Sequence, residues 1–358
     1  MPIGYLITTA GVALVGWSAV LGRRPRRSSP FRPSYVVGLW LNWPLVAFLV
    51  LAASTALAID QNGIDSSGLR IGLGLAVVAT AALGVLHRRA HGTGPALERA
   101  LDAGLGAAWR EGVDPGLAAR LRRRPSLLRV LLAPLSPRRR AVVRVANLRY
   151  GSAGRANLLD LYRDRSGRVG RPVLVHLHPL HGSKRVGTRH LLHRLAAAGW
   201  ICVAANYRRG LDDGLSDVHD VIAWVREHGP GHGADPDVIF LAGSSLGAHH
   251  ALRAAAACGD VAGVVSLYAY YGDAFPAEHA PPCFVAHGDQ DTLVPVDDAR
   301  SFVERLRETS ASPVVYAELP GAQHGFDLFR SRRFDTVVDA IEAFTASVRQ
   351  QPYPFAHS

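Results

Sequence analysis

A serine lies at the centre of the pentapeptide Gly243-Ser244-Ser245-Leu246-Gly247. The pentapeptide follows an apolar run typical of a buried strand and precedes a helical pattern that starts at Leu246. Small residues on both sides of Ser245 permit the sharp strand-to-helix turn that exposes a nucleophilic hydroxyl at the positive end of a helix. The pattern therefore predicts that Ser245 is a nucleophile. The alternative is a glycine-rich helix start that Ser244 merely caps.

A nucleophilic serine needs a base, and the base needs an acid that orients it. His324 lies in the glycine-flanked segment Gly321–Phe326, directly after an apolar run. Asp289 and Asp291 lie in the segment His287–Pro295, which follows another apolar run. We expect His324 to be the base and Asp291 the acid. Asp289 is the rival acid, although its position is more typical of a residue that shapes the turn.

A cluster of histidines, His176, His178 and His181, suggests a metal site as an alternative chemistry. A metallohydrolase motif of the form H-x-H-x-D-H would need an aspartate at position 180, where Leu180 stands. Three cysteines are far apart and lack C-x-x-C spacing: Cys202, Cys258 and Cys283. We therefore expect neither a metal nor another cofactor, and we interpret the cysteines as buried apolar residues in a reducing compartment.

The region from Ala141 onward alternates short β-branched runs with helical patterns. This alternation predicts an open, mostly parallel sheet with helices on both faces. An opening hairpin is expected at residues 142–163, followed by strands at 173–178, 201–206, 238–242, 261–267, 283–287 and 314–319. Helices are expected at residues 187–198, 217–227, 246–257, 297–309 and 332–348.

Residues 144–348 resemble the carboxylesterases and lipases of the α/β-hydrolase superfamily, in the hormone-sensitive-lipase-like group, and especially the membrane-attached esterases of actinobacteria. The resemblance implies an α/β-hydrolase catalytic domain over residues 141–350. It also implies ester hydrolysis through an acyl-enzyme intermediate, with Ser245, Asp291 and His324 at the triad positions. The matching segments run in the family's order: Asn157–Tyr162, Asn206–Arg208, Asp217–Glu227, Gly233–Asp237, the pentapeptide around Ser245, His287–Pro295 and Pro320–Phe329.

Two segments depart from the family's pattern. Where the family has His-Gly-Gly, this chain has the segment His178–Gly182, and Pro179 has no N–H to offer a developing oxyanion. The expected oxyanion donors are therefore the N–H of Leu246 and that of Leu180 or His181. The second departure is a largely missing cap between residues 271 and 281, which predicts a shallow, solvent-open pocket.

The first 90 residues form a membrane region with three expected transmembrane helices. The apolar runs are Pro2–Gly22, which has no charged residue, Val36–Ile59, and Leu69–Leu86, which contains Arg70. A helix over the first run would rise about 31 Å, one hydrocarbon core. A secretory signal for the first run, or buried helices of a soluble domain, are the alternatives.

The charge of the chain supports this membrane interpretation. The net charge is +11, and residues 1–150 hold 20 Lys/Arg against 6 Asp/Glu. No nucleic-acid recognition motif accompanies the arginines, so we expect membrane lipid and no nucleic acid as a partner. Arginines lie between the first two spans and after the third, whereas the loop Asp60–Gly68 has no Lys or Arg. The positive-inside rule then predicts a protein integral to the cytoplasmic membrane, with its catalytic domain facing the cytoplasm.

Residues 91–140 are expected to form a connector. The segment Leu117–Leu132 carries five arginines among leucines and predicts an amphipathic helix on the inner leaflet, with a solvated linker as the alternative. The first functional hypothesis is a membrane-anchored serine esterase acting on small-molecule or lipid esters. A serine peptidase or acyltransferase with the same triad is the second, and a weakly active hydrolase fold that serves as an interaction module is the third. The sequence carries no signal for the oligomeric state.

Overall fold

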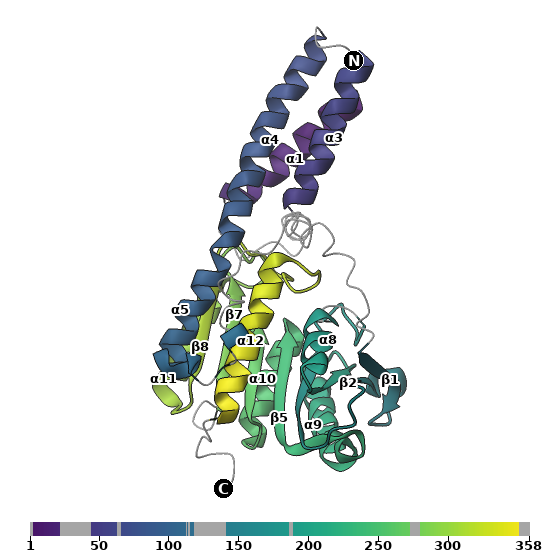
Figure 1. Ribbon diagram of the computed structural model, residues 1–358, viewed down its shortest axis with the longest axis vertical. Helices are drawn as coiled ribbons and strands as arrows, with labels where there is room; N and C mark the ends of the chain where they lie inside the picture. The colour runs from purple at the N-terminus through teal and green to yellow at the C-terminus, as the bar shows by residue number, and fades with distance from the viewer. Residues whose placement is uncertain are drawn as a thin grey trace.

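Three apolar helices pack together at the N-terminal end of the chain, the first and last of them parallel and the middle one antiparallel to both (Figure 1). The structure is a computed structural model that describes residues 3–21, 44–62, 66–111, 113, 115–117, 141–185, 189–272 and 280–350. The bundle helices are α1 (Ile3–Leu21), α3 (Pro44–Asn62) and α4 (Ser67–His91). Small residues let α1 and α4 approach closely, since a Cβ atom on Gly16 would lie 2.9 Å from that of Ala82.

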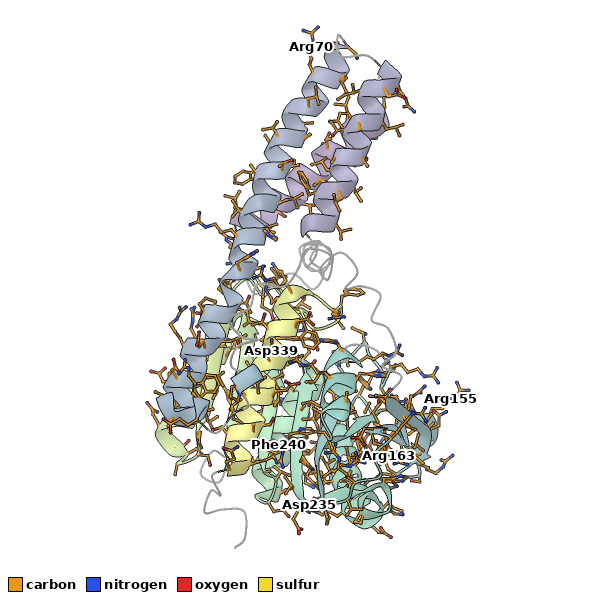
Figure 2. The ribbon with its side chains drawn as sticks, in the orientation of Figure 1. Arg70, Arg155, Arg163, Asp235, Phe240 and Asp339 are labelled. Carbon is orange, nitrogen blue, oxygen red and sulfur yellow. The ribbon has the colours of Figure 1, made fainter. Side chains whose placement is uncertain are left out.

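The alternating direction of these helices gives the bundle two distinct ends. Arg70, at the start of α4, lies at the end farthest from the sheet (Figure 2). The side chain of Arg89, near the end of α4, reaches the carbonyl of Ala19 in the last turns of α1 at 3.5 Å. The starts of α1 and α4 and the end of α3 therefore lie at the far end, and the basic end of α4 lies next to the sheet.

The helices correspond to the apolar runs found in the sequence. Among the described residues, two helices are long and apolar enough to cross a membrane, α1 and the run Ser67–Leu105, and Val46–Gln61 is a shorter apolar helix. Several expected features lie outside the described residues: the start of the second run at 36–43, the arginines between the first two runs, and the basic segment from residue 118 to 140.

Helix α5 (Thr93–Leu105) follows α4 after one residue, Gly92, whose backbone is itself in the right-handed helical region. Leu97 and Leu101 of α5 are fully buried in the same core cluster as strand and C-terminal helix residues. A Cβ atom on Gly104 would lie 2.7 Å from the carbonyl oxygen of Val314, so α5 lies directly against that strand. Residues 93–105 thus pack into the α/β domain (here residues 93–350), a difference from the connector expected over residues 91–140.

An eight-stranded sheet in the order β1-β2-β4-β3-β5-β6-β7-β8 forms the centre of the α/β domain. The first three strands in this order pair antiparallel, and all later neighbours pair parallel. The strands are β1 (Val142–Arg149), β2 (Leu158–Asp164), β3 (Arg171–Leu177), β4 (Ile201–Ala205), β5 (Ala234–Ser244), β6 (Gly263–Leu267), β7 (Cys283–Gly288) and β8 (Val314–Leu319). The expected mostly parallel α/β sheet is confirmed.

Helices cover both faces of this sheet, which explains why its central strands are apolar on both sides. On one face α5 packs with α8 (Arg189–Ala197) and α12 (Arg332–Gln350). On the other face lie α9 (Leu211–His228), α10 (Leu246–Cys258) and α11 (Val296–Thr309). Short 3₁₀ turns occur at Ala107–Arg110, Gly154–Asn157 and Gly229–His232.

The C-terminal edge of the parallel strands faces the helix bundle. β8 ends at Leu319, and the next two residues touch the junction of α4 and α5. A Cβ atom on Gly92 would lie 3.3 Å from Cγ of Pro320, and one on Gly321 would lie 3.1 Å from Cβ of Arg89. Because all parallel strands end along this edge, the described residues that directly follow them lie on the side of the bundle.

Candidate active site

Ser245 lies in a strained turn between β5 and α10. Its φ of 54° and ψ of −120° are unusual for a residue with a Cβ atom. The turn is held by its neighbours: the Ser245 N–H donates to the carbonyl of Leu267 at 2.9 Å, and its carbonyl accepts from the N–H of His249 at 3.1 Å. The observed turn is the elbow that presents a serine hydroxyl at the edge of a sheet.

Both glycines of the pentapeptide are required by close backbone contacts. A Cβ atom on Gly247 would lie 2.3 Å from the carbonyl oxygen of Leu177, at the end of β3. A Cβ atom on Gly243 would lie 2.3 Å from the carbonyl carbon of Gly247. These contacts press the start of α10 against the loop that follows β3. The elbow and that loop are therefore packed together at the sheet edge.

The structure brings together the three residues expected to form a triad. Nε2 of His324 lies 3.0 Å from Oγ of Ser245, and Nδ1 of His324 lies 2.7 Å from Oδ2 of Asp291. Asp291 Oδ1 accepts the N–H groups of Leu293 and Val294 at 2.8 and 2.9 Å. Burial alone would raise the pKa of Asp291, but His324 and these hydrogen bonds hold it below its usual value. A carboxylate so held can orient the imidazole as a base towards the serine.

Asp289 makes a different contact. Its Oδ1 accepts the backbone N–H of Gly321 at 2.7 Å, and burial raises the pKa of its carboxyl. This bond joins the loop after β7 to the start of the loop that carries His324. Asp289 thus shapes the turn, as its position in the sequence suggested.

His287 and Asp327 are two buried side chains near the triad to which the sequence analysis gave no role. His287 Nε2 lies 3.0 Å from the carbonyl of Val294 and 3.4 Å from Oδ2 of Asp291. Burial lowers the pKa of His287, which favours its neutral form. A neutral imidazole there adds no net charge beside Asp291.

Asp327 lies beneath the elbow. Its carboxylate accepts the hydroxyl of Ser244 at 2.5 Å and that of Tyr268, and burial raises its pKa. The Tyr268 ring packs edge-on against His324 with centroids 4.5 Å apart, and Tyr268 has a positive φ of 41°. Asp327 therefore connects the residue before the nucleophile to the ring beside the base. The sequence shows only that Asp327 lies three residues after His324. The fold alone brings its two hydroxyl partners to it.

The loop His178–Gly182 forms a tight turn beside the elbow. The N–H of Gly182 donates to the carbonyl of Pro179 at 2.8 Å, so Leu180 and His181 are the two central residues of the turn. Their side chains are exposed, and Leu246 is half-buried. Pro179 has no N–H, and the N–H of Gly182 is already bonded to the Pro179 carbonyl, which leaves the N–H groups of Leu180 and His181 as the candidate donors.

Both ends of this loop are fixed by buried polar contacts. At its start, the ring of His178 stacks on Tyr207, and the Tyr207 hydroxyl donates to the His178 carbonyl. At its end, the buried Lys184 ammonium donates to Asp160 at 2.6 Å and to Asn147 at 2.8 Å. The loop is therefore positioned by the body of the domain.

The three histidines of the suggested metal site differ in their surroundings. His176 and His178 are buried, whereas His181 is exposed, and burial lowers the pKa of His176 to about 3. Among the described residues, no group of three His, Cys, Asp or Glu side chains could hold a metal ion.

Residues 273–279, where the cap would lie, are outside the described residues.

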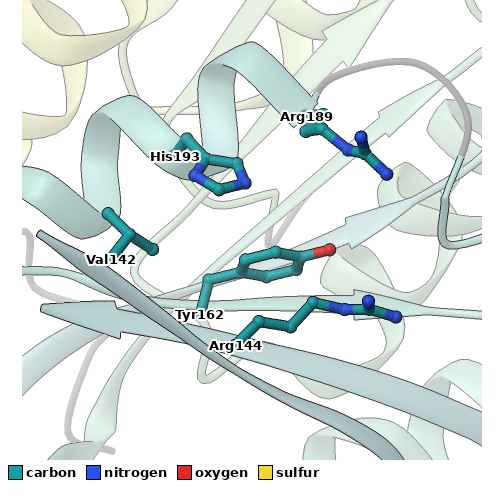
Figure 3. A pocket seen from close by; sticks show the side chains of 5 residues that line it. All are labelled: Val142, Arg144, Tyr162, Arg189 and His193. Atoms are coloured by element: carbon teal, nitrogen blue, oxygen red, sulfur yellow. The ribbon is translucent and has the colours of Figure 1, made fainter. Parts of the chain in front are cut away.

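A separate cavity of about 270 Å³ lies between the first two strands and α8 (Figure 3). Its lining residues are Val142, Arg144, Tyr162, Arg189 and His193. No residue of the proposed triad lines it, and its lining is mixed, with polar groups from the arginine, tyrosine and histidine side chains beside apolar surface. This cavity is therefore distinct from the site around Ser245.

Comparison with known proteins gives relatives along most of the chain. Residues 180–279 match a family model described as alpha/beta hydrolase fold. The probable carboxylic ester hydrolase LipM of Mycobacterium tuberculosis is 34% identical over an alignment 343 residues long; the match covers 76% of this chain and 77% of LipM. Esterase LipQ of the same organism is 34% identical over an alignment 281 residues long; the match covers 62% of this chain and 66% of LipQ.

Among solved structures, a bacterial heroin esterase superposes with a TM-score of 0.50 at 17% identity. The match covers 67% of this chain and 98% of that structure. At this identity the likeness is one of fold.

Proposed function

Because the chain belongs to the carboxylic ester hydrolases of the α/β-hydrolase family, we propose that it cleaves esters through a triad of Ser245, His324 and Asp291. One observation carries this proposal: an unbroken hydrogen-bond chain, 3.0 and 2.7 Å long, runs from the serine hydroxyl through the imidazole to a buried carboxylate. The strained backbone at the serine supports it, because such strain persists where a side chain must be held in one place.

Acylation begins when Oγ of Ser245 attacks the carbonyl carbon of the ester and His324 Nε2 accepts the hydroxyl proton. The Asp291 carboxylate stabilises the imidazolium that results. Collapse of the tetrahedral intermediate breaks the bond to the alcohol oxygen, which takes the proton from Nε2. The products of this half-reaction are the free alcohol and an acyl ester on Ser245.

Deacylation repeats these steps with water as the nucleophile. His324 accepts a proton from the water that attacks the acyl carbon and returns it to Oγ of Ser245, releasing the carboxylic acid. In both halves the oxyanion develops beside the start of α10, where the N–H of Leu246 directly follows the serine. The second donor in this proposal is the N–H of Leu180 or His181 in the adjacent turn.

Membrane anchoring by α1, α3 and α4 is the second part of the proposal. Their outward faces carry exposed apolar side chains, among them Ile7, Leu14, Leu57 and Val77. Arg88 and Arg89 lie at the domain end of α4, where positive charge favours the cytoplasmic side. We therefore place the catalytic domain in the cytoplasm and the α3–α4 connection outside. A cysteine introduced at Ser66 should react with a membrane-impermeant thiol reagent in intact cells, and a cysteine introduced in place of Arg27 should not.

Labelling with a fluorophosphonate tests the catalytic part of the proposal. The wild-type chain should be labelled, and Ser245→Ala should not, while Ser244→Ala keeps the label. Hydrolysis of p-nitrophenyl esters without cleavage of aminoacyl anilides would favour an esterase over a peptidase. Labelling of Ser245→Ala at the wild-type rate would contradict the assignment of the nucleophile.

A further inference from the structure

The connection between the bundle and the α/β domain is rigid. Helix α4 passes into α5 through Gly92 with helical backbone angles, φ −69° and ψ −12°, and α5 is built into the core of the domain. The side chain of Arg332, at the start of α12, hydrogen-bonds to His91. Together with the contact of Gly92 on Pro320, this bond fixes the domain in one orientation relative to α4. The domain therefore cannot turn its C-terminal sheet edge away from the plane where α4 leaves the bundle.

Exposed apolar side chains gather on this same edge. Among the described residues of the α/β domain, six large apolar side chains are exposed. Five of them, here called the apolar rim, lie in or directly after the connections that follow β3, β4, β6, β7 and β8: Leu180, Leu211, Tyr270, Leu293 and Phe329. Their exposed fractions range from 38% to 53%. The sixth, Val169, lies between β2 and β3 at the opposite edge.

The apolar rim lies on both sides of the strand that carries Ser245. Ser245 follows β5, which lies between the strands that carry the rim residues. Exposed apolar side chains on a soluble enzyme are normally scattered, so a gathering around one site marks a contact surface. Exposed Arg185 and Arg209 lie on the loops after β3 and β4 at the same edge, and Arg88 is exposed at the end of α4. Apolar side chains interspersed with arginines match the chemistry of an anionic leaflet surface.

We propose that the apolar rim rests in the headgroup region of the bilayer, so that the site receives esters held in the leaflet by a long apolar chain. This inference rests on the proposed esterase function and on the proposed membrane helices. The occupant of the surface follows from continuity: the rim lies on the side of the domain from which α4 enters the bundle. An ester whose chain stays in the leaflet then presents its carbonyl to Ser245 without leaving the membrane.

Fluorescence quenching in liposomes tests the placement of the rim. The full chain carries one thiol of intermediate exposure, Cys258, since Cys202 and Cys283 are buried. In a Cys258→Ser background, a fluorophore is attached to a cysteine introduced by Phe329→Cys or, as the matched control, by Val169→Cys. Lipids with a quencher near the headgroup should quench the probe at position 329 strongly and the probe at 169 little. Equal quenching at both positions would overturn the proposal.

Kinetics of the full chain in liposomes test the substrate class. The double variant Leu211→Glu with Phe329→Glu places two carboxylates on the rim, and Val169→Glu places one on the opposite edge. We expect the double variant to hydrolyse a long-chain fluorogenic ester embedded in the vesicles about tenfold more slowly, since the lost contact is apolar area removed from water. Its turnover of dissolved p-nitrophenyl acetate should stay within about twofold of wild type, as should both activities of Val169→Glu.

The two substrates separate the inference from its premise. A wild-type chain that hydrolyses neither ester would contradict the proposed function itself. A wild-type chain that hydrolyses the dissolved ester, but whose rate on the embedded ester does not change in the double variant, would overturn the inference alone. Equal loss on both substrates would also count against it, because it would indicate damage to the site.

Discussion

The acid of the triad can be tested by replacing one oxygen atom. In Asp291→Asn the side chain keeps its shape but one acceptor becomes an NH₂ donor. Oδ1 of Asp291 accepts two backbone N–H groups, from Leu293 and Val294, and Oδ2 accepts from Nδ1 of His324. The asparagine can retain both backbone bonds only if its carbonyl oxygen takes the place of Oδ1. Its NH₂ group then points at the imidazole and requires an unprotonated Nδ1.

This change of donor moves the proton of the neutral His324 ring from Nδ1 to Nε2. With Nδ1 unprotonated, the neutral ring carries its proton on Nε2, 3.0 Å from the hydroxyl of Ser245. Such a nitrogen cannot accept the serine proton. The same change of tautomer in Ser-His-Asp hydrolases lowers kcat about 10⁴-fold, which corresponds to about 5 kcal/mol of activation free energy. We expect a loss of that size for Asp291→Asn.

The assay is hydrolysis of a dissolved p-nitrophenyl ester by the full chain, with thermal unfolding as a check on folding. Asp289→Asn is the matched control, because an asparagine carbonyl can still accept the N–H of Gly321. It should cost less than about tenfold in kcat, the size of one altered hydrogen bond. An Asp291→Asn variant that loses less activity than Asp289→Asn would refute the assignment of the acid.

Three further predictions concern the residues that support the triad and the oxyanion turn. Asp327→Ala leaves two buried hydroxyl groups without their acceptor, which costs about 1–3 kcal/mol of stability for each. The variant should have a Tm several degrees lower and should change kcat more than KM, whereas Asp327→Asn should recover part of both losses. His181→Pro removes one candidate oxyanion donor and should lower kcat about 10²–10³-fold with Tm nearly unchanged; if only Leu180→Pro has this effect, Leu180 is the donor. Burial would raise the pKa of Asp160, but the hydrogen bonds from Lys184 and its other partners hold that pKa below its usual value of 3.8. The ionised carboxylate therefore stabilises the fold fully above pH 3.8, and this stabilisation is lost as the pH falls through the lowered pKa. In Asp160→Asn the free energy of unfolding should therefore fall less steeply as the pH is lowered into the acid range. The variant should also be less stable at pH 7 by about 3–5 kcal/mol, because the buried ammonium of Lys184 loses its partner.

Most of the sheet could be predicted from the sequence because its strands are buried on both faces and flanked by turn residues. β8 has the expected bounds, and β4 and β7 differ from theirs by one residue. The elbow was also predictable, since a serine between two glycines after such a strand admits few other turns. Assignment of Ser245, Asp291 and His324 to the triad stays a prediction that the geometry supports.

Other features depend on contacts that no local pattern encodes. The role of α5 in the core depends on the contact of Gly104 with Val314, more than two hundred residues away. The pairing of Ser244 with Asp327 is likewise set by the fold alone. Helix α5 has only 13 residues, and nothing in so short an apolar pattern specifies the sheet against which it packs.

Under the proposed membrane anchoring, the unbroken passage from α4 into α5 would make the enzyme sensitive to the thickness of the bilayer. Arg70 and Arg88 bound the apolar part of α4, and the 18 steps between them rise about 27 Å. This span is slightly shorter than a typical hydrocarbon core of about 30 Å, so tilting cannot relieve the mismatch; thinning of the lipid or snorkelling of the two arginines would have to do so. A thicker bilayer therefore draws the rigidly attached domain towards the hydrocarbon, and a thinner one lets it rise. Lipid acyl length becomes a control on how deep the serine sits.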